Sequence, residues 1–274
     1  MKYLILGDLH CREIWKDIVA KEGDSCDKII FLGDYLPPRG FTYDDPTDAC
    51  GFLYSVLDYK DQNPDKVVLL RGNHCMEMLG YYWARCYPKV HPKVAEYCQS
   101  DDVKNWFLNN TQWVYRIPNT SIVCSHAGLG KKFLSNAHDA LERNKIRYYS
   151  GIPTPWDWII DNINKLEPSP LFGFTDNNPF DTNGESSCQP CTWIRPYTLL
   201  QYGNKNTIHV VGHTPVDHIC NFKKKFIDEA RQNDENFEEK KEEYEDYAEV
   251  WCCDCLENRE YLIIEDWKFK TCKL

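Results

Sequence analysis

Six side chains with metal-binding atoms follow short aliphatic runs at widely spaced points of the sequence. They offer carboxylate oxygens, one carboxamide oxygen and imidazole nitrogens, a mixed donor set that suits borderline divalent ions such as Mn, Fe or Zn. Asp8 and His10 are two residues apart, so on an extended segment their side chains point to the same side. The six candidate ligands are Asp8, His10, Asp34, Asn73, His126 and His213.

The elements that must position these ligands are buried strands. Apolar runs rich in Val and Ile, each followed by a polar cluster, predict strands covered on both faces of a sheet. Because several loops converge where such strands end, we expect the ligands to meet at one edge. Helices are predicted between the early strands, over residues 11–22 and 47–59. The predicted strands are residues 3–6, 29–32, 67–70, 122–124 and 208–211.

The organisation predicted for the whole chain is a single domain, 1–274, because 42% apolar side chains in 274 residues can form a large core. Residues 151–190 are rich in Pro, Asn, Asp, Ser and Trp, which predicts an irregular insertion near the active edge. Residues 223–249 are densely charged and acidic. They predict an exposed helical insertion or a flexible loop, with a partner-docking role as the alternative. Residues 250–266 predict a closing pair of strands with its turn at residues 257–259.

The charge of the chain restricts its partners. A formal charge of -10 argues against binding of nucleic acids or anionic membranes, whose phosphates need a positive surface. An anionic substrate must then be attracted by a local positive centre, which bound divalent ions would supply. The sequence has no secretory signal pattern and no apolar run of membrane-spanning length, and its fourteen cysteines fit reduced thiols. We therefore expect a soluble, cytoplasmic protein, and the sequence predicts no particular oligomeric state.

Five motifs in this order resemble the calcineurin-like metallophosphoesterases. Between residues 7 and 215 the chain has Gly-Asp-Leu-His, Gly-Asp-Tyr, Arg-Gly-Asn-His, Ser-His-Ala-Gly and Gly-His-Thr-Pro. The closer resemblance is to the phosphoprotein-phosphatase branch, with its bacterial and phage Ser/Thr phosphatases and symmetrical diadenosine-tetraphosphate hydrolases. Many relatives outside this branch have a second histidine where this chain has Pro215. The resemblance implies an α/β fold, a four-layer α/β/β/α sandwich in which helices flank two mixed β-sheets.

The same resemblance implies two divalent metal ions, with manganese first and Fe, Zn or Ni as alternatives. One ion would be held by Asp8, His10 and Asp34, and the other by Asp34, Asn73, His126 and His213, so that Asp34 bridges them. Two such ions lower the pKa of a shared water, and the hydroxide attacks phosphorus directly. His74 would protonate the departing oxygen. Arg39 and Arg195 would clamp the phosphate, because a guanidinium binds two phosphate oxygens at once.

The stretch around Arg39 departs from the family pattern. The family usually has Gly-Asp-x-x-Asp-Arg-Gly, in which the second Asp orients the general-acid histidine. This chain has Pro37-Pro38 and one extra residue before the arginine, so the orienting carboxylate is missing from its usual place. Asp44, Asp45 and Glu77 are the alternatives that we consider for orienting His74.

Two pairs of cysteines have the two-residue spacing of zinc ligands, Cys188 with Cys191 and Cys252 with Cys255. Unconnected thiols are the alternative, because such pairs arise easily by chance in a cysteine-rich chain. Residues 253–259 match the spacing of cysteine-dependent phosphatases, but their acidic side chains would repel phosphate, which argues against a thiol mechanism.

The predicted function is metal-dependent hydrolysis of phosphate monoesters, in the manner of a Ser/Thr phosphoprotein phosphatase. The alternatives are hydrolysis of a nucleotide polyphosphate such as diadenosine tetraphosphate, and a catalytically silent binding scaffold. The expected partner is thus a phosphorylated protein or a nucleotide substrate. The acidic stretch from Asp228 to Glu249 is the one feature of the sequence that favours a binding scaffold.

Overall fold

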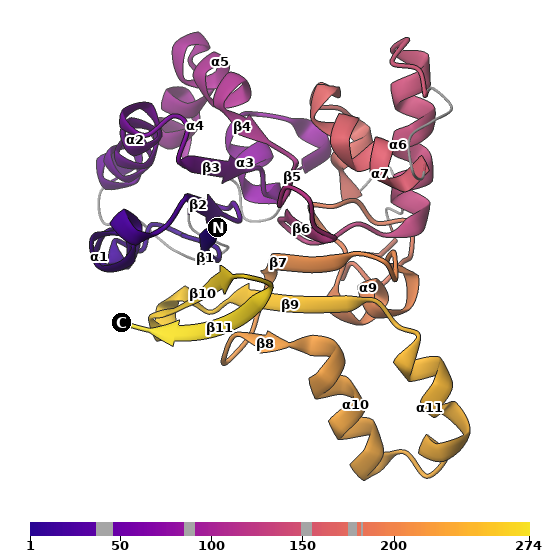
Figure 1. Cartoon of the computed structure of the whole chain (residues 1–274). Helices are drawn as coiled ribbons and strands as arrows, with labels where there is room; N and C mark the ends of the chain where they lie inside the picture. Colours follow the sequence, from indigo (N-terminus) through magenta and orange to yellow (C-terminus); the bar gives the residue numbers. More distant parts are fainter. Residues whose placement is uncertain (37–45, 85–90, 149–154, 175–179, 182) are drawn as a thin grey trace. The chain divides into compact units, whose positions relative to one another are not determined.

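The computed structural model describes residues 1–36, 46–84, 91–148, 155–174, 180–181 and 183–274. The fold is mixed α/β, with two mixed sheets flanked by helices (Figure 1). The chain divides into two compact units that alternate along the sequence. The first unit comprises Met1–Trp113, Pro215–Ile219 and Cys253–Leu274, and the second comprises Val114–Thr214 and Cys220–Cys252.

The first unit is built on a six-stranded sheet in the order β11-β10-β1-β2-β3-β4. Strands β1 to β4 are parallel to one another, and β10 is antiparallel to both β1 and β11. Aliphatic side chains fill the centre of this sheet; Leu4, for example, lies opposite Ile29 and both are fully buried. The strands are β1 Lys2–Leu6, β2 Lys28–Phe31, β3 Val67–Leu70, β4 Thr111–Gln112, β10 Glu260–Glu265 and β11 Lys268–Lys273.

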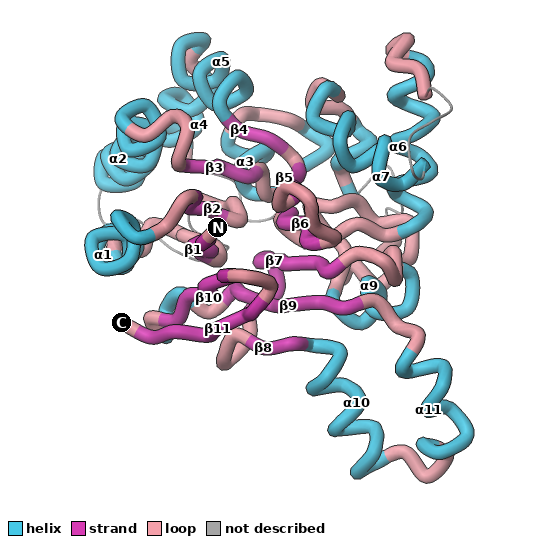
Figure 2. Tube along the Cα trace, in the orientation of Figure 1, coloured by secondary structure: helices cyan, strands magenta, loops and turns pink. Residues whose placement is uncertain are grey.

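Helices connect and cover the strands of the first unit (Figure 2). Helix α2 packs against β3 and α4, and α5 contacts both α4 and β4. Trp15 of α1 is buried, with its ring 5.7 Å from that of Phe31 at the end of β2. The helices are α1 Ile14–Glu22, η1 Gly23–Ser25, α2 Pro46–Gln62, α3 Asn73–Met78, η2 Tyr82–Ala84, α4 Pro92–Gln99, α5 Asp101–Asn110 and η5 Leu256–Asn258.

The second unit contains a five-stranded sheet in the order β5-β6-β7-β9-β8. Strand β6 is parallel to β7 and antiparallel to β5. The strands are β5 Val114–Arg116, β6 Ile122–Ser125, β7 Ile208–Pro215, β8 Cys220–Asn221 and β9 Glu249–Asp254. The helices are α6 Lys131–Arg143, α7 Pro155–Asn162, η3 Ile163–Lys165, η4 Pro170–Phe172, α9 Pro196–Tyr202, α10 Phe222–Asn233 and α11 Phe237–Glu245.

The five predicted strands are confirmed as β1, β2, β3, β6 and β7, and the two early helices as α1 and α2. Helix α1 begins three residues later than predicted, at Ile14. Its start is delayed because His10 and Cys11 adopt left-handed backbone conformations, with φ of 44° and 57°, which do not continue into a right-handed helix. Among the described residues, no helix combines the length and apolar character needed to cross a membrane.

The predicted pairing of two closing strands within residues 250–266 is wrong. Both strands exist, as β9 and β10, but β9 pairs with β8 in one sheet while β10 pairs with β1 and β11 in the other. A short 3-10 turn, η5, and the left-handed residue Arg259, with φ of 64°, redirect the chain between them. Both strands are largely buried, so their apolar pattern did not reveal which neighbour each would choose.

Candidate metal centre

Two neighbouring strand ends in the first unit bring three donor side chains together. Asp8 follows β1 and Asp34 follows β2, and these two strands are parallel neighbours. Asp8, His10 and Asp34 each offer one ligand atom, and these atoms lie within 4.8 Å of one another. His10 Nε2 lies 3.6 Å from Asp8 Oδ2. Two carboxylates and one imidazole at this spacing fit a borderline divalent cation.

Hydrogen bonds fix the orientation of His10. Its Nδ1 lies 2.7 Å from the carbonyl oxygen of Leu36, and its backbone N–H donates to the carbonyl oxygen of Asp34 at 2.9 Å. If Nδ1 donates to Leu36, Nε2 keeps the lone pair that a metal ion needs, the usual arrangement of a ligating histidine. Burial opposes protonation of His10, but the carboxylates of Asp8 and Asp34 outweigh it and raise the pKa of the imidazole. The site is therefore electrostatically attractive to a positive charge.

Strained backbone marks three of the candidate ligands. His10, Asp34 and His213 have φ of 44°, 45° and 63°, in the left-handed region that residues other than glycine seldom occupy. Each such conformation costs about 1–3 kcal/mol and persists where the surroundings enforce it, often at functional sites. The sequence did not reveal this feature, because Asp and His, although enriched at left-handed positions, still have negative φ in most places where they occur.

The start of α3 holds the carboxylate of Asp34. Asp34 Oδ1 accepts a hydrogen bond from the backbone N–H of His74 at 3.0 Å and lies 3.8 Å from Cys75 Sγ. A Cβ atom added to Gly72 would overlap this same oxygen, so only glycine leaves room for the carboxylate. Asn73, the fourth candidate ligand of the first unit, is the first residue of α3 and is buried.

A carboxylate lies beside His74. Glu77 Oε2 is 3.4 Å from His74 Nδ1, across one turn of α3, and both side chains are largely buried. The rings of His74 and His10 are 5.8 Å apart, in an edge-to-face arrangement. Glu77 is thus placed to orient His74, whereas Asp44 and Asp45 lie outside the described residues. Arg39 also lies outside them.

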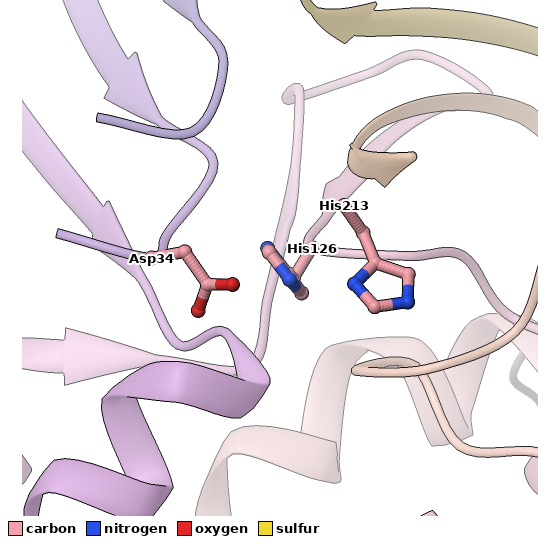
Figure 3. Close-up of side chains that lie close together, drawn as sticks. All are labelled: Asp34, His126 and His213. Atoms are coloured by element: carbon pink, nitrogen blue, oxygen red, sulfur yellow. The ribbon is translucent and has the colours of Figure 1, made fainter. Parts of the chain in front are cut away.

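The second unit contributes the two remaining histidines. His126 follows β6 and His213 lies in the neighbouring parallel strand β7, and the backbone N–H of Gly212 donates to the carbonyl oxygen of His126 at 2.9 Å. The two imidazole rings are 5.0 Å apart and both are buried. Figure 3 draws these rings with Asp34, which belongs to the first unit. Neutral imidazole nitrogens are ligands of borderline divalent cations, so this pair has the chemistry that the prediction requires.

Arg195 lies beside His213 in the second unit. Its Nη1 donates to the carbonyl oxygen of His213 at 3.3 Å and to Thr214 Oγ1 at 3.1 Å, and its Nε donates to the carbonyl oxygen of Asn183 at 2.7 Å. Its guanidinium carbon lies 5.9 Å from the ring of Trp193, which is 5.2 Å from that of His213. These contacts hold a permanent positive charge next to a candidate metal ligand.

Asp181, which sequence reasoning missed, organises the loop that leads to Arg195. Its carboxylate accepts hydrogen bonds from the backbone N–H groups of Gly184, Glu185 and Ser186, and from Gln189 Nε2. Partial burial works against ionisation, but these hydrogen bonds prevail and lower the pKa of Asp181. The run Asp-Thr-Asn-Gly at residues 181–184 contains the turn signal Asn-Gly, yet the sequence did not show that the turn supports a candidate site residue.

The cysteine pairs do not contribute to either donor group. In the described part of the chain, the clusters with the spacing of metal ligands consist of aspartates and histidines. Both pairs, Cys188 with Cys191 and Cys252 with Cys255, belong to that part, and none of the four forms a disulfide.

Comparisons with known proteins agree with these motifs and this fold. The catalytic subunit of serine/threonine-protein phosphatase 4 from Kluyveromyces lactis is 28% identical over an alignment of 159 residues, which covers 52% of this chain and 44% of that protein. The chain thus matches less than half of this curated relative.

Two solved structures show a similar fold. A cold-active protein-tyrosine phosphatase of a psychrophilic Shewanella species matches with a TM-score of 0.51 and 14% identity, over 98% of this chain and 77% of that one. A structure of a cold-active protein tyrosine phosphatase at 1.1 Å gives a TM-score of 0.52 and 15% identity, over 98% and 78%. The profile described as calcineurin-like phosphoesterase matches residues 1–251. This chain therefore belongs to the family of calcineurin-like phosphoesterases.

Proposed function

We propose that this protein is a two-metal phosphoesterase that hydrolyses phosphate monoesters, with phosphorylated serine and threonine residues of proteins as its substrates. The observation that carries the proposal is the convergence of Asp8, His10 and Asp34 at two strand ends in a member of this family. The preference for phosphoproteins draws support from the similarity to a Ser/Thr phosphatase subunit.

The six candidate ligands fit two divalent cations by their donor chemistry. Asp8, His10 and Asp34 would hold the first ion, and Asp34 would be shared with a second held by Asn73, His126 and His213. We propose manganese for both, because the carboxylate and carboxamide oxygens suit it, and the alternatives are Fe, Zn and Ni, which the imidazoles suit. When bound, the two ions would supply an activated water and neutralise charge that develops on the phosphate.

The other side chains then have separate tasks. Arg195 binds phosphate oxygens with a guanidinium that stays charged at any working pH, and Arg39 is proposed for the same task. His74 delivers a proton from its imidazole to the departing oxygen, because an alkoxide of serine or threonine leaves poorly without one. Glu77, through its contact with His74 Nδ1, fixes the ring so that Nε2 faces the substrate.

The test is a substrate panel with purified protein whose metal content has been measured. With manganese added, we expect hydrolysis of p-nitrophenyl phosphate and of phosphoserine and phosphothreonine peptides. Faster turnover of diadenosine tetraphosphate than of every phosphopeptide would replace the proposed substrate by a nucleotide. If the metal-loaded protein hydrolyses none of these compounds, the proposed activity is wrong and the protein acts as a binding scaffold.

A further inference from the structure

Helices α10 and α11 form a tied hairpin in the second unit (Figure 2). At its base, Lys223 Nζ donates to the carbonyl oxygens of Glu245 and Tyr247, both at 2.7 Å. At its tip, Asp234 accepts hydrogen bonds from Tyr244 Oη at 2.7 Å and from Lys240 Nζ at 3.1 Å. The hairpin is therefore held at both ends, and the space between its helices has a defined shape.

An open cavity of about 550 Å³ lies between this hairpin and α9. Aromatic rings form part of its lining, from Tyr197 on α9, Phe226 on α10 and Tyr244 on α11. The ring of Tyr197 is 5.9 Å from that of Phe226, which is 5.1 Å from that of Tyr244. Tyr197 is 55% exposed although it is a large aromatic residue, so its ring is accessible to a ligand.

The charged side chains that line the cavity are mostly acidic. Glu229, Asp234 and Glu235 line it, whereas Lys240 is the single basic residue in the lining and already binds Asp234. The surrounding segment, residues 222–249, carries eleven acidic and six basic residues, a net charge of -5. Aromatic faces beside carboxylates form an environment that suits a guanidinium, which can stack on a ring while it pairs with an acid.

We propose that this cavity, which we call the hairpin cavity, binds an arginine side chain within a basic segment of a partner protein. The acidic lining of the cavity favours a positively charged ligand. The exposed ring of Tyr197 favours a planar cation over a compact ammonium. Tyr197 lies two residues after Arg195, so the hairpin cavity is close along the chain to the proposed phosphate clamp. Binding at the hairpin cavity does not depend on hydrolysis, so it can be tested separately from the proposed function.

The probe is a fluorescein-labelled hexa-arginine peptide, titrated with the full chain and followed by fluorescence anisotropy. We expect it to bind more tightly than hexa-lysine, and hexa-glutamate not to bind. The double variant Glu229→Gln/Glu235→Gln should weaken binding of hexa-arginine about tenfold, because it removes two carboxylates from the lining. Tyr197→Ala should abolish the preference for arginine over lysine, because the stacking surface is lost.

A matched control is Glu238→Gln/Glu242→Gln, which removes the same charge from exposed positions on α11 that do not line the cavity. This control should bind hexa-arginine within about twofold of the parent chain. Equal weakening in both double variants would mean unspecific charge attraction and would overturn the proposal, as would absence of hexa-arginine binding at millimolar protein. Thermal unfolding shows whether each variant is folded. If the double variant does not fold, the single variant Glu235→Gln, at an exposed position, is used instead.

Discussion

Among the described residues, Asp34 takes part in several features of the candidate site. Its carboxylate is grouped with Asp8 and His10, accepts a hydrogen bond at the start of α3, and sits on a backbone with φ of 45°. The sequence predicts these residues as ligands because each follows an aliphatic run. It could not predict the contact between His74 and Glu77, since three acidic residues were possible partners and only spatial placement distinguishes them.

The change Asp34→Asn tests the shared ligand. Loss of one negative charge between two proposed cations should remove both metals and lower turnover of p-nitrophenyl phosphate by a factor of about 1,000 or more. Metal analysis by mass spectrometry measures the first effect, and a rate assay measures the second. The control Asp139→Asn, at an exposed position on α6, should keep both metals. Retention of two metals with near-normal turnover in the Asp34 variant would refute the bridging role.

The change Glu77→Gln tests the orientation of His74. The amide cannot fix the ring as an anion does, so proton delivery should suffer while metal binding is retained. Hydrolysis of a phosphoserine peptide, which has a poor leaving group, should slow by about 10- to 100-fold, and that of p-nitrophenyl phosphate by much less. His74→Asn should show the same pattern more strongly. Equal slowing of both substrates would mean that Glu77 has a general structural role instead.

Among the secondary-structure elements, the positions of the strands could be predicted from the sequence more directly than the pairing of one strand with another. Val67–Leu70 is a short, wholly aliphatic run, and it became β3 with the predicted bounds. The error concerned β9, whose partner β8 lies about thirty residues earlier in the sequence. A pattern of buried residues fixes which face of a strand is covered, but the neighbouring strand is chosen by the rest of the fold.

Gly72, at the junction of β3 and α3, leaves the space that the Asp34 carboxylate occupies. In Gly72→Ala the added methyl group overlaps Asp34 Oδ1, so the carboxylate must move and metal affinity should fall about 10- to 100-fold. Isothermal titration with manganese measures this affinity. The control is Gly51→Ala in α2, where an added Cβ meets no atom within 4 Å. That control should keep its affinity and become more stable by about 0.5–1 kcal/mol, because alanine favours helix. Unchanged affinity in the Gly72 variant would show that the site tolerates the displacement.

At the scale of the whole molecule, acid should destabilise the chain through His209. This residue of β7 is fully buried, and burial lowers the pKa of its imidazole to about 4. In the unfolded chain the pKa of this imidazole is about 6.5. Below that pH the unfolded state therefore binds a proton, whereas the imidazole of the folded state stays neutral. The free energy of unfolding therefore has its full value above about pH 6.5. It falls by about 3 kcal/mol as the pH decreases to about 4.

Urea unfolding at about pH 7.5 and about pH 4.5 measures this loss. In His209→Leu the imidazole is absent, so the free energy of unfolding should fall less between these two pH values than in the parent chain. An identical fall in both proteins would assign the acid sensitivity to other groups, such as Asp181, whose lowered pKa acts in the same direction at lower pH.

The pairing of β1 with β10 joins two strands that are far apart in the sequence. Leu4 lies opposite Ile263, which is synthesised 259 residues later (263 minus 4). Until then β1 presents an unpaired backbone edge to solvent or to any chaperone that binds nascent chains. Completion of the first sheet is thus a late event, and ribosome-stalled chains that end before residue 260 should be captured by chaperones far more readily than released ones.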